Sequence, residues 1–414
     1  MPSSKLPDGD LAFNYFPGNY RWSHGLLIAL GGAPWGGAEI DEVNRIGLRL
    51  KDRAGDDDVA WFNEWTGEAE RIENIGHAEA DKGHSLTAAA YLRRAAHYCH
   101  IGERFAHPKT DASQAAYMRG VQAFRKAAGL MTRPRIEHVE VPYEGTSLPG
   151  ILVHSDPVPG RAGKGPVMLF LDGFDVTKEI QYFRGIPDLA ARGVSCLILD
   201  GPGNGESIRF RNLKLHHETE RHAGAAYDFL AARPEFDPRR IGIMALSLGG
   251  YYAPRAAAMD HRFACCLAWG AEWDYHAKWR QRLARIAGGE KISLSVPLQH
   301  LQWVFGAKDR EEAFRKLEGF RLDGVLQKMK CPFLLVHGEG DQQVPFEDAR
   351  RAVNACGSAR KELKVFTREE GGYHHCQLDN VSIAVAYMWD WVADVLTAGP
   401  GQATTGARDG IPAR

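Results

Sequence analysis

Residues 241–250 have the sequence IGIMALSLGG, and this stretch decides the fold. The apolar run that ends at Leu246 predicts a buried strand, and the amphipathic stretch after Gly250 predicts a helix. Ser247 therefore lies on a tight turn between a strand and a helix, which is the geometry of a nucleophile elbow. The usual pattern is G-x-S-x-G, and Ala245 replaces its first glycine. A serine that only caps a helix would give a similar local sequence, so the rest of the chain has to decide.

The composition is that of an ordinary globular protein. The 414 residues are 44% hydrophobic and 25% charged, and the net charge of −1 gives no reason to expect a nucleic acid or an anionic membrane as a partner. No apolar run approaches the roughly 20 residues that span a bilayer, and the start does not resemble a signal peptide. The seven cysteines include no CxxC pair. They are expected to be reduced core residues of a cytoplasmic protein without a structural zinc site.

The chain is predicted to have two domains and a tail. Residues 1–133 are expected to form a helical N-terminal domain, irregular to about residue 36 and helical from about 38 to 130. In residues 134–398 an antiparallel hairpin precedes continuous apolar strands that alternate with helices, which predicts a mostly parallel, doubly wound sheet. Residues 399–414 are expected to be a flexible tail. The fold class predicted is α/β.

An insertion breaks this alternation between about residues 271 and 326. The segment is rich in Trp, Tyr, Arg and Gln, reads as helical and follows the strand after the elbow, so it is predicted to form a lid. Aromatic residues in and beside it are candidates to line a flat pocket or simply to pack between the lid and the core. They are Trp269, Trp273, Tyr275, Trp279 and Trp303.

Three residue types follow three different predicted strands. Ser247 ends one strand, Asp341 lies on the loop after the apolar run CPFLLVHG, and His374 and His375 lie on the loop after ELKVFT. In a parallel sheet these loops meet beyond the carboxyl ends of the strands, and the order Ser, Asp, His is that of α/β-hydrolases. A serine hydroxyl needs a histidine to take its proton and an acid to orient that histidine. The combination predicts a catalytic triad.

The sequence leaves the identity of the base open. His374 is preferred to His375 because a histidine just after a Gly-x pair is the common arrangement, and His375 is then a pocket or packing residue. Among the acids, Glu339 lies too close to its strand and Asp390 lies in a helix-like stretch, so Asp341 is preferred. His97 and His100 are three residues apart, but without a third ligand they are expected to be ordinary helix residues and not a metal site.

Two backbone amides are predicted to hold the oxyanion. One is the N–H of Leu248, next to the serine, and the other is the N–H of Phe174 in the loop Asp172-Gly173-Phe174. The stretch DGPGNGES, residues 200–207, follows a strand but matches neither phosphate-binding pattern. It is expected to be a glycine-rich turn beside the active site.

These motifs resemble one subgroup of the α/β-hydrolases. The runs VMLFLDGFDVTKE, DGPGNGES, LSLGGYYAPRAA and GYHHCQ carry the resemblance. The subgroup contains 2,6-dihydroxypseudooxynicotine hydrolase, the chain-shortening hydrolases of fungal pigment polyketides and the fermentation–respiration switch proteins. The resemblance implies a helical N-terminal domain and a homodimer for this protein. The first two members of the subgroup cleave a C–C bond next to a carbonyl with a serine triad. The resemblance also implies a functional glutamate in the cap region, which the nicotine-pathway hydrolase uses, and Glu272 is the nearest candidate for it in this sequence.

Three functions are compared. The leading hypothesis is hydrolysis of a C–C bond in an aromatic ketone or β-diketone, and the second is a carboxylesterase or amidase acting on small aromatic esters. The third is a non-catalytic regulatory binding protein, which the complete triad disfavours. The expected partner is a small aromatic molecule, with no cofactor, since the triad needs neither metal nor nucleotide. Residues expected to bind this substrate are Glu272, Trp273, Tyr275 and His375.

Overall fold

The structure is a computed structural model that describes residues 13–53, 55, 57–156, 163–289 and 295–397. The predicted flexible tail, residues 399–414, lies outside the described residues. Within the described ranges, no helix combines the length and the apolar character needed to cross a membrane.

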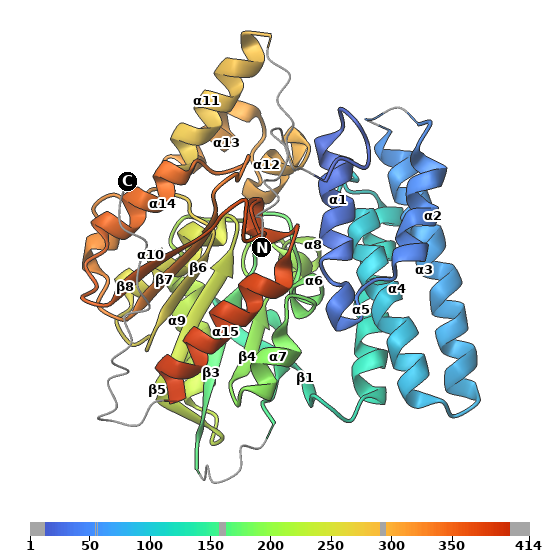
Figure 1. Ribbon diagram of the computed structural model, residues 1–414, viewed down its shortest axis with the longest axis horizontal. Helices are drawn as coiled ribbons and strands as arrows, with labels where there is room; N and C mark the ends of the chain where they lie inside the picture. Colours follow the sequence, from blue (N-terminus) through green and yellow to red (C-terminus); the bar gives the residue numbers. More distant parts are fainter. Residues whose placement is uncertain (1–12, 54, 56, 157–162, 290–294, 398–414) are drawn as a thin grey trace, which may run out of the picture.

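Five helices form a bundle at one side of the molecule (Figure 1). They are α1 (Tyr20–Leu30), α2 (Ile40–Leu50), α3 (Asp58–Asp81), α4 (Ser85–Glu103) and α5 (Asp111–Leu130). Side chains cap the starts of α1, α3 and α5, because the first N–H groups of a helix lack partners within it. Asp57 accepts a hydrogen bond from the Ala60 N–H, and Thr110 and Ser113 form a reciprocal capping box at the start of α5.

Helix α1 corrects one expectation, because the first 36 residues are not irregular throughout. The Asn19 side chain accepts a hydrogen bond from the Trp22 N–H and begins the helix. Trp22, Leu26 and Ile28 are buried against the rest of the protein, so tertiary packing stabilises an 11-residue helix that is short by itself. Glycines and aromatic residues on both sides obscured this helix in the sequence.

An eight-stranded sheet forms the centre of the second part, in the order β1-β2-β4-β3-β5-β6-β7-β8. The strands β1 and β2 form the predicted antiparallel hairpin, β2 pairs antiparallel with β4, and all later pairs are parallel. This confirms the predicted α/β-hydrolase fold with its mostly parallel sheet. The strands are β1 (Ile136–Tyr143), β2 (Thr146–Val153), β3 (Gly165–Leu171), β4 (Ser195–Leu199), β5 (Phe236–Leu246), β6 (Cys266–Trp269), β7 (Phe333–Gly338) and β8 (Lys361–Phe366).

Helices cover both faces of this sheet, so β4 and β7 are buried throughout and β3 is buried from its second residue on. Apolar side chains on one face pack with α7 and α15, and those on the other face pack with α9, α10 and α14. Gly185, with a φ of 77°, separates α6 from α7. The helices are α6 (Lys178–Tyr182), α7 (Ile186–Ala191), α8 (Gly205–Arg211), α9 (Thr219–Ala231), α10 (Gly249–Met259), α14 (Phe346–Ala355) and α15 (Val381–Thr397).

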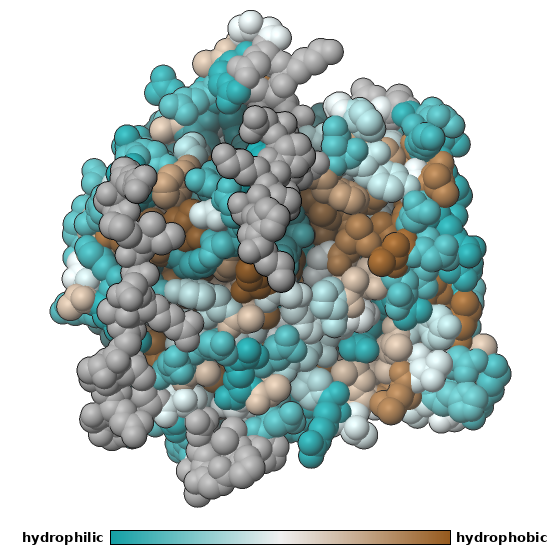
Figure 2. Space-filling model, in the orientation of Figure 1, coloured by the Kyte–Doolittle hydropathy of each residue, from teal (hydrophilic) through white to brown (hydrophobic). Residues whose placement is uncertain are grey.

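The inserted segment forms helices beyond the carboxyl ends of the strands (Figure 1). They are α11 (Tyr275–Ala287), α12 (Leu298–Phe305) and α13 (Arg310–Leu317). The face of the molecule in Figure 2 is largely hydrophilic, with hydrophobic residues gathered near α1, where the bundle meets the sheet. The carboxyl ends of β5, β7 and β8, the lid and α1 therefore converge on one region of the molecule.

Candidate active site

Ser247 lies at the end of β5, on the turn that leads into α10. Its φ is 60°, a left-handed conformation that a residue other than glycine rarely adopts. Gly250 is required beside it, because a Cβ there would lie 2.5 Å from the carbonyl oxygen of Gly270. The strained serine and the close backbone approach together form the nucleophile elbow geometry that the sequence predicts.

A hydrogen-bonded chain joins Ser247, His375 and Asp341. The Nε2 atom of His375 lies 2.9 Å from the Ser247 Oγ, and its Nδ1 atom lies 2.7 Å from the Asp341 Oδ2. The side chains of His375 and Asp341 are only 5% and 1% exposed. When His375 is neutral and carries its proton on Nδ1, the Ser247 hydroxyl donates a hydrogen bond to Nε2, and the Nδ1–H donates one to the carboxylate of Asp341. This is the arrangement of a serine triad.

The predicted preference for His374 over His375 as the base is wrong, because it is His375 that contacts both Ser247 and Asp341. The backbone is extended at His374 and then enters the short turn His375–Gln377, so neighbouring side chains point in different directions. The backbone N–H of His374 donates to Asp379, and its ring packs edge-on against Tyr373. His375 instead turns toward the carboxyl ends of the strands. The spacing after a glycine pair carries no information about this turn.

Charge and burial shift the pKa values of this pair in opposite directions. Burial alone would lower the pKa of His375, but the charge of Asp341 and the hydrogen bond to it raise the pKa to about 10. Burial alone would raise the pKa of Asp341, but His375 and backbone N–H groups hold that pKa below its usual range. The N–H groups of Gln343 and Val344 donate to its Oδ1 at 2.7 and 3.0 Å. The acid is therefore ionised and held in one orientation.

Leu248 and Phe174, whose amides are the predicted oxyanion donors, line the same cavity as Ser247. Neither amide donates a hydrogen bond to another group among the described residues. Asn204, in the glycine-rich turn of residues 200–207, donates to the Gly173 carbonyl at 2.7 Å. Because a trans peptide is planar, this bond directs the Phe174 N–H to the opposite side. The glycine-rich turn lies beside the site, as expected, and it orients a predicted oxyanion donor.

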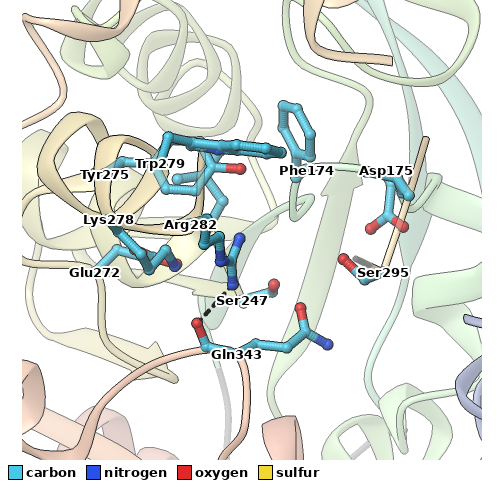
Figure 3. Close-up of a pocket in the computed structure, with 12 residues that line it drawn as sticks. Phe174, Asp175, Ser247, Glu272, Tyr275, Lys278, Trp279, Arg282, Ser295 and Gln343 are labelled. Atoms are coloured by element: carbon cyan, nitrogen blue, oxygen red, sulfur yellow. Dashed lines mark hydrogen bonds and ion pairs between the residues drawn. The ribbon is translucent and has the colours of Figure 1, made fainter. Parts of the chain in front are cut away.

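Two cavities meet at Ser247. The polar cavity, shown in Figure 3, lies under α11 and includes Glu272, Lys278 and Arg282. The apolar cavity lies against α1 and includes Ile28 and Leu378. Ser247, Asp175, Ser295 and Gln343 line both. A ligand that reaches Ser247 can therefore extend in two directions with different chemical surroundings.

The structure brings some of the predicted substrate residues together and excludes others. Glu272 and Tyr275 line the polar cavity, and His375 lines the apolar one. Trp273 lines neither cavity, and this prediction is corrected. Residues 273 and 274 make backbone contacts with residues 321 and 322. Consecutive side chains of such an extended segment point to opposite sides. Glu272 faces the cavity, and the next side chain, that of Trp273, packs against the apolar core.

The other aromatic candidates also divide. Trp279 lines the polar cavity, and Trp269 lines the apolar one. Trp303 packs against the rings of His107 and His300 and lines neither of these two cavities. The lid aromatics therefore serve partly as cavity walls and partly as packing between the lid and the bundle.

Two family models match this chain over more than half of its length. A model described as the prolyl oligopeptidase family matches residues 179–399, and one described as esterase FrsA-like matches residues 50–285. The protein belongs to the α/β-hydrolases of this type. Both matches include Ser247, and the second also covers most of the helical bundle.

Curated relatives extend the similarity of this α/β-hydrolase to nearly the whole chain. It is 29% identical over 387 residues to 2,6-dihydropseudooxynicotine hydrolase of Paenarthrobacter nicotinovorans, covering 90% of this chain and 94% of the relative. It is 28% identical to the hydrolase acrC of Aspergillus aculeatus, covering 92% and 97% of the two chains. It is 31% identical to the α/β hydrolase pydG of an Acremonium species, covering 82% and 86%.

A solved structure shares the fold of this α/β-hydrolase. The crystal structure of 2,6-dihydroxy-pseudo-oxynicotine hydrolase has a TM-score of 0.72 and 24% sequence identity, and the match covers 89% of this chain and 95% of that chain. AbyA5 matches with a TM-score of 0.64 at 19% identity, over 87% and 91%. The combination of sheet and helical region is therefore a shared architecture.

Several residues at the site of this α/β-hydrolase escaped sequence reasoning. Gln343 connects them by hydrogen bonds. Its side-chain amide lies 2.9 Å from the Tyr20 hydroxyl and 3.3 Å from the His24 Nε2, both on α1. Its carbonyl accepts a hydrogen bond from Arg282 of the lid at 2.8 Å. Nothing in the sequence pairs residues some 320 positions apart. The one available signal is the position of Gln343 two residues after Asp341.

Proposed function

We propose that this α/β-hydrolase is a serine hydrolase that cleaves a C–C bond next to a carbonyl in an aromatic ketone or β-diketone. The observation that carries the catalytic part is the hydrogen-bonded chain from Ser247 through His375 to Asp341. The C–C assignment rests on the resemblance to a subgroup in which two kinds of member, the 2,6-dihydroxypseudooxynicotine hydrolase and the chain-shortening hydrolases of fungal pigment polyketides, cleave such bonds with a serine triad. The names of the relatives, which include a 2,6-dihydropseudooxynicotine hydrolase, support a small organic substrate.

In this proposal His375 is the general base. It takes the proton of Ser247 as the serine attacks the carbonyl, or as the serine activates a water molecule. The amides of Leu248 and Phe174 stabilise the oxyanion, and one such donor typically contributes about 3 kcal/mol. The carbon leaving group departs as an enolate, and the imidazolium of His375 supplies the proton that makes it a ketone. Water releases the other half as a carboxylic acid.

The pH dependence of turnover tests the base. A base acts in its neutral form, and the pKa of His375 is raised to about 10, so we expect kcat/KM to rise with pH from neutrality and to level off near that value. Asp341→Asn removes the charge that raises this pKa, so the midpoint of its residual activity should move to lower pH. Rate profiles between about pH 5 and 11 measure both. A wild-type profile that is flat from pH 6 to 10 contradicts this assignment.

A carboxylesterase is the second candidate, because a family model described as esterase FrsA-like covers residues 50–285. Purified protein should be assayed with 1-phenyl-1,3-butanedione and with 4-nitrophenyl acetate and benzoate. We expect the diketone to yield a carboxylic acid and a methyl ketone, detected by liquid chromatography. Fast ester turnover without any cleavage of the diketone would establish the esterase in place of the C–C hydrolase.

A further inference from the structure

The polar cavity beside Ser247 is lined by two basic and two acidic side chains. Its cations are Lys278 and Arg282, one helical turn apart on the same face of α11. Lys278 forms an ion pair with Glu272. Asp175, the other acid of the cavity, pairs with Arg104 of the bundle. Each carboxylate in the cavity therefore already has its own cation.

Arg282 is the cation without an acid. Among the described residues no carboxylate lies within ion-pair distance of its guanidinium, and its one hydrogen bond is to the carbonyl of Gln343. A guanidinium has five N–H donors, so donors remain for a ligand, and the Arg282 Cζ lies 5.5 Å from the centroid of the Trp279 ring. Figure 3 shows the guanidinium at the Ser247 end of the cavity.

Arg184 provides a useful contrast, because it is a buried arginine at the apolar cavity. Its guanidinium donates to the carbonyl of Ile28 near the end of α1, at 3.1 Å. Free carbonyls at a helix end attract a cation, so Arg184 has a structural role in binding the bundle to the core. Arg282 has no such helix end as a partner and belongs to the inserted lid.

We propose that Arg282 binds a carboxylate of the substrate and so selects acidic substrates for Ser247. An arginine fork matches the two oxygens of a carboxylate, and such charge-assisted bonds are strong where water is excluded. The apolar cavity on the other side of Ser247 accepts a hydrophobic group. The substrate class is therefore a carbonyl compound with a carboxylate at one end and an apolar, aromatic group at the other. The carbonyl group of this substrate class rests on the proposed function, whereas its carboxylate rests on Arg282 alone.

Binding to an inactive protein tests the assignment without requiring turnover. The full chain with Ser247→Ala is titrated by calorimetry with 4-oxo-4-phenylbutanoate and with its primary amide, which has the same shape without the charge. We expect the acid to bind about 10- to 100-fold more tightly than the amide. Adding Arg282→Gln should remove this difference, because glutamine can still donate to the Gln343 carbonyl but has no charge.

Two further variants separate charge from folding. Arg280→Gln, on the exposed face of the same helix, should keep the preference for the acid. Arg282→Lys should keep part of it, since the charge remains without the fork. Equal affinity for acid and amide, no measurable binding of the acid, or an equal loss for both ligands in Arg282→Gln would overturn the assignment. A failure of C–C cleavage in the enzyme assay would leave this binding result unchanged, so the two proposals fail separately.

Discussion

Replacing Ser247 by alanine is expected to lower kcat by about 10⁴- to 10⁶-fold, since the nucleophile of a triad has no substitute within the site. The oxyanion amides and the cavities remain, so a weak residual activity above the uncatalysed rate should persist. The φ of 60° applies to alanine as to serine, and the strain of the elbow therefore changes little. The measurement is initial rates on the most active substrate of the panel, with the thermal midpoint recorded beside them.

A matched control for this variant is Ser358→Ala. Ser358 is a buried serine whose hydroxyl donates to the carbonyl of Arg360 in the segment before β8, and it lines neither cavity. It should retain full turnover, with only a small loss of stability from the missing hydrogen bond. If Ser247→Ala kept more than a tenth of the activity, the serine would not be the nucleophile. If it kept full biological function, the chain would be a binding protein.

The adjacent histidines should respond very differently to the same substitution. We expect His375→Ala to lose about 10⁴-fold or more in kcat, because Ser247 then has no base and Asp341 loses its partner. His374→Ala should stay within about threefold of wild type, because the His374 ring contacts neither triad partner. His375 is buried and His374 is half-buried, so the thermal midpoint of each variant has to be recorded beside its rate.

Single-turnover and steady-state rates on both variants, with circular dichroism as the folding control, make this comparison. A large loss in His374→Ala together with near-normal turnover in His375→Ala would restore the sequence-based preference. Equal large losses with equal thermal midpoints would mean that the loop needs both rings, and the assignment of His375 as the one base would be wrong. Added imidazole should restore part of the activity of His375→Ala alone, because the space left by the ring lies beside Ser247.

Patterns of local sequence were enough to predict the fold. Continuous apolar runs such as the one ending at Leu246 have few alternatives to a buried parallel strand, and the small residues Gly249 and Gly250 permit the close approach of the backbone that the turn at Ser247 needs. The helix Tyr20–Leu30 was missed for the opposite reason. Its stability comes from the buried contacts of Trp22 and Leu26, which a short, glycine-flanked segment does not display.

The sequence by itself determined the sheet, the elbow at Ser247 and the strand ends that carry Asp341 and the histidine pair. Each of these depends on periodicity and turn chemistry within about ten residues. Only the tertiary structure decided that His375 faces Ser247, that Trp273 turns away and that Arg282 lies beside the serine. Those outcomes depend on the direction of a side chain within one turn of loop, and on contacts between the lid, the bundle and the sheet. Such contacts form across long chain separations, and a single sequence contains no local signal of them.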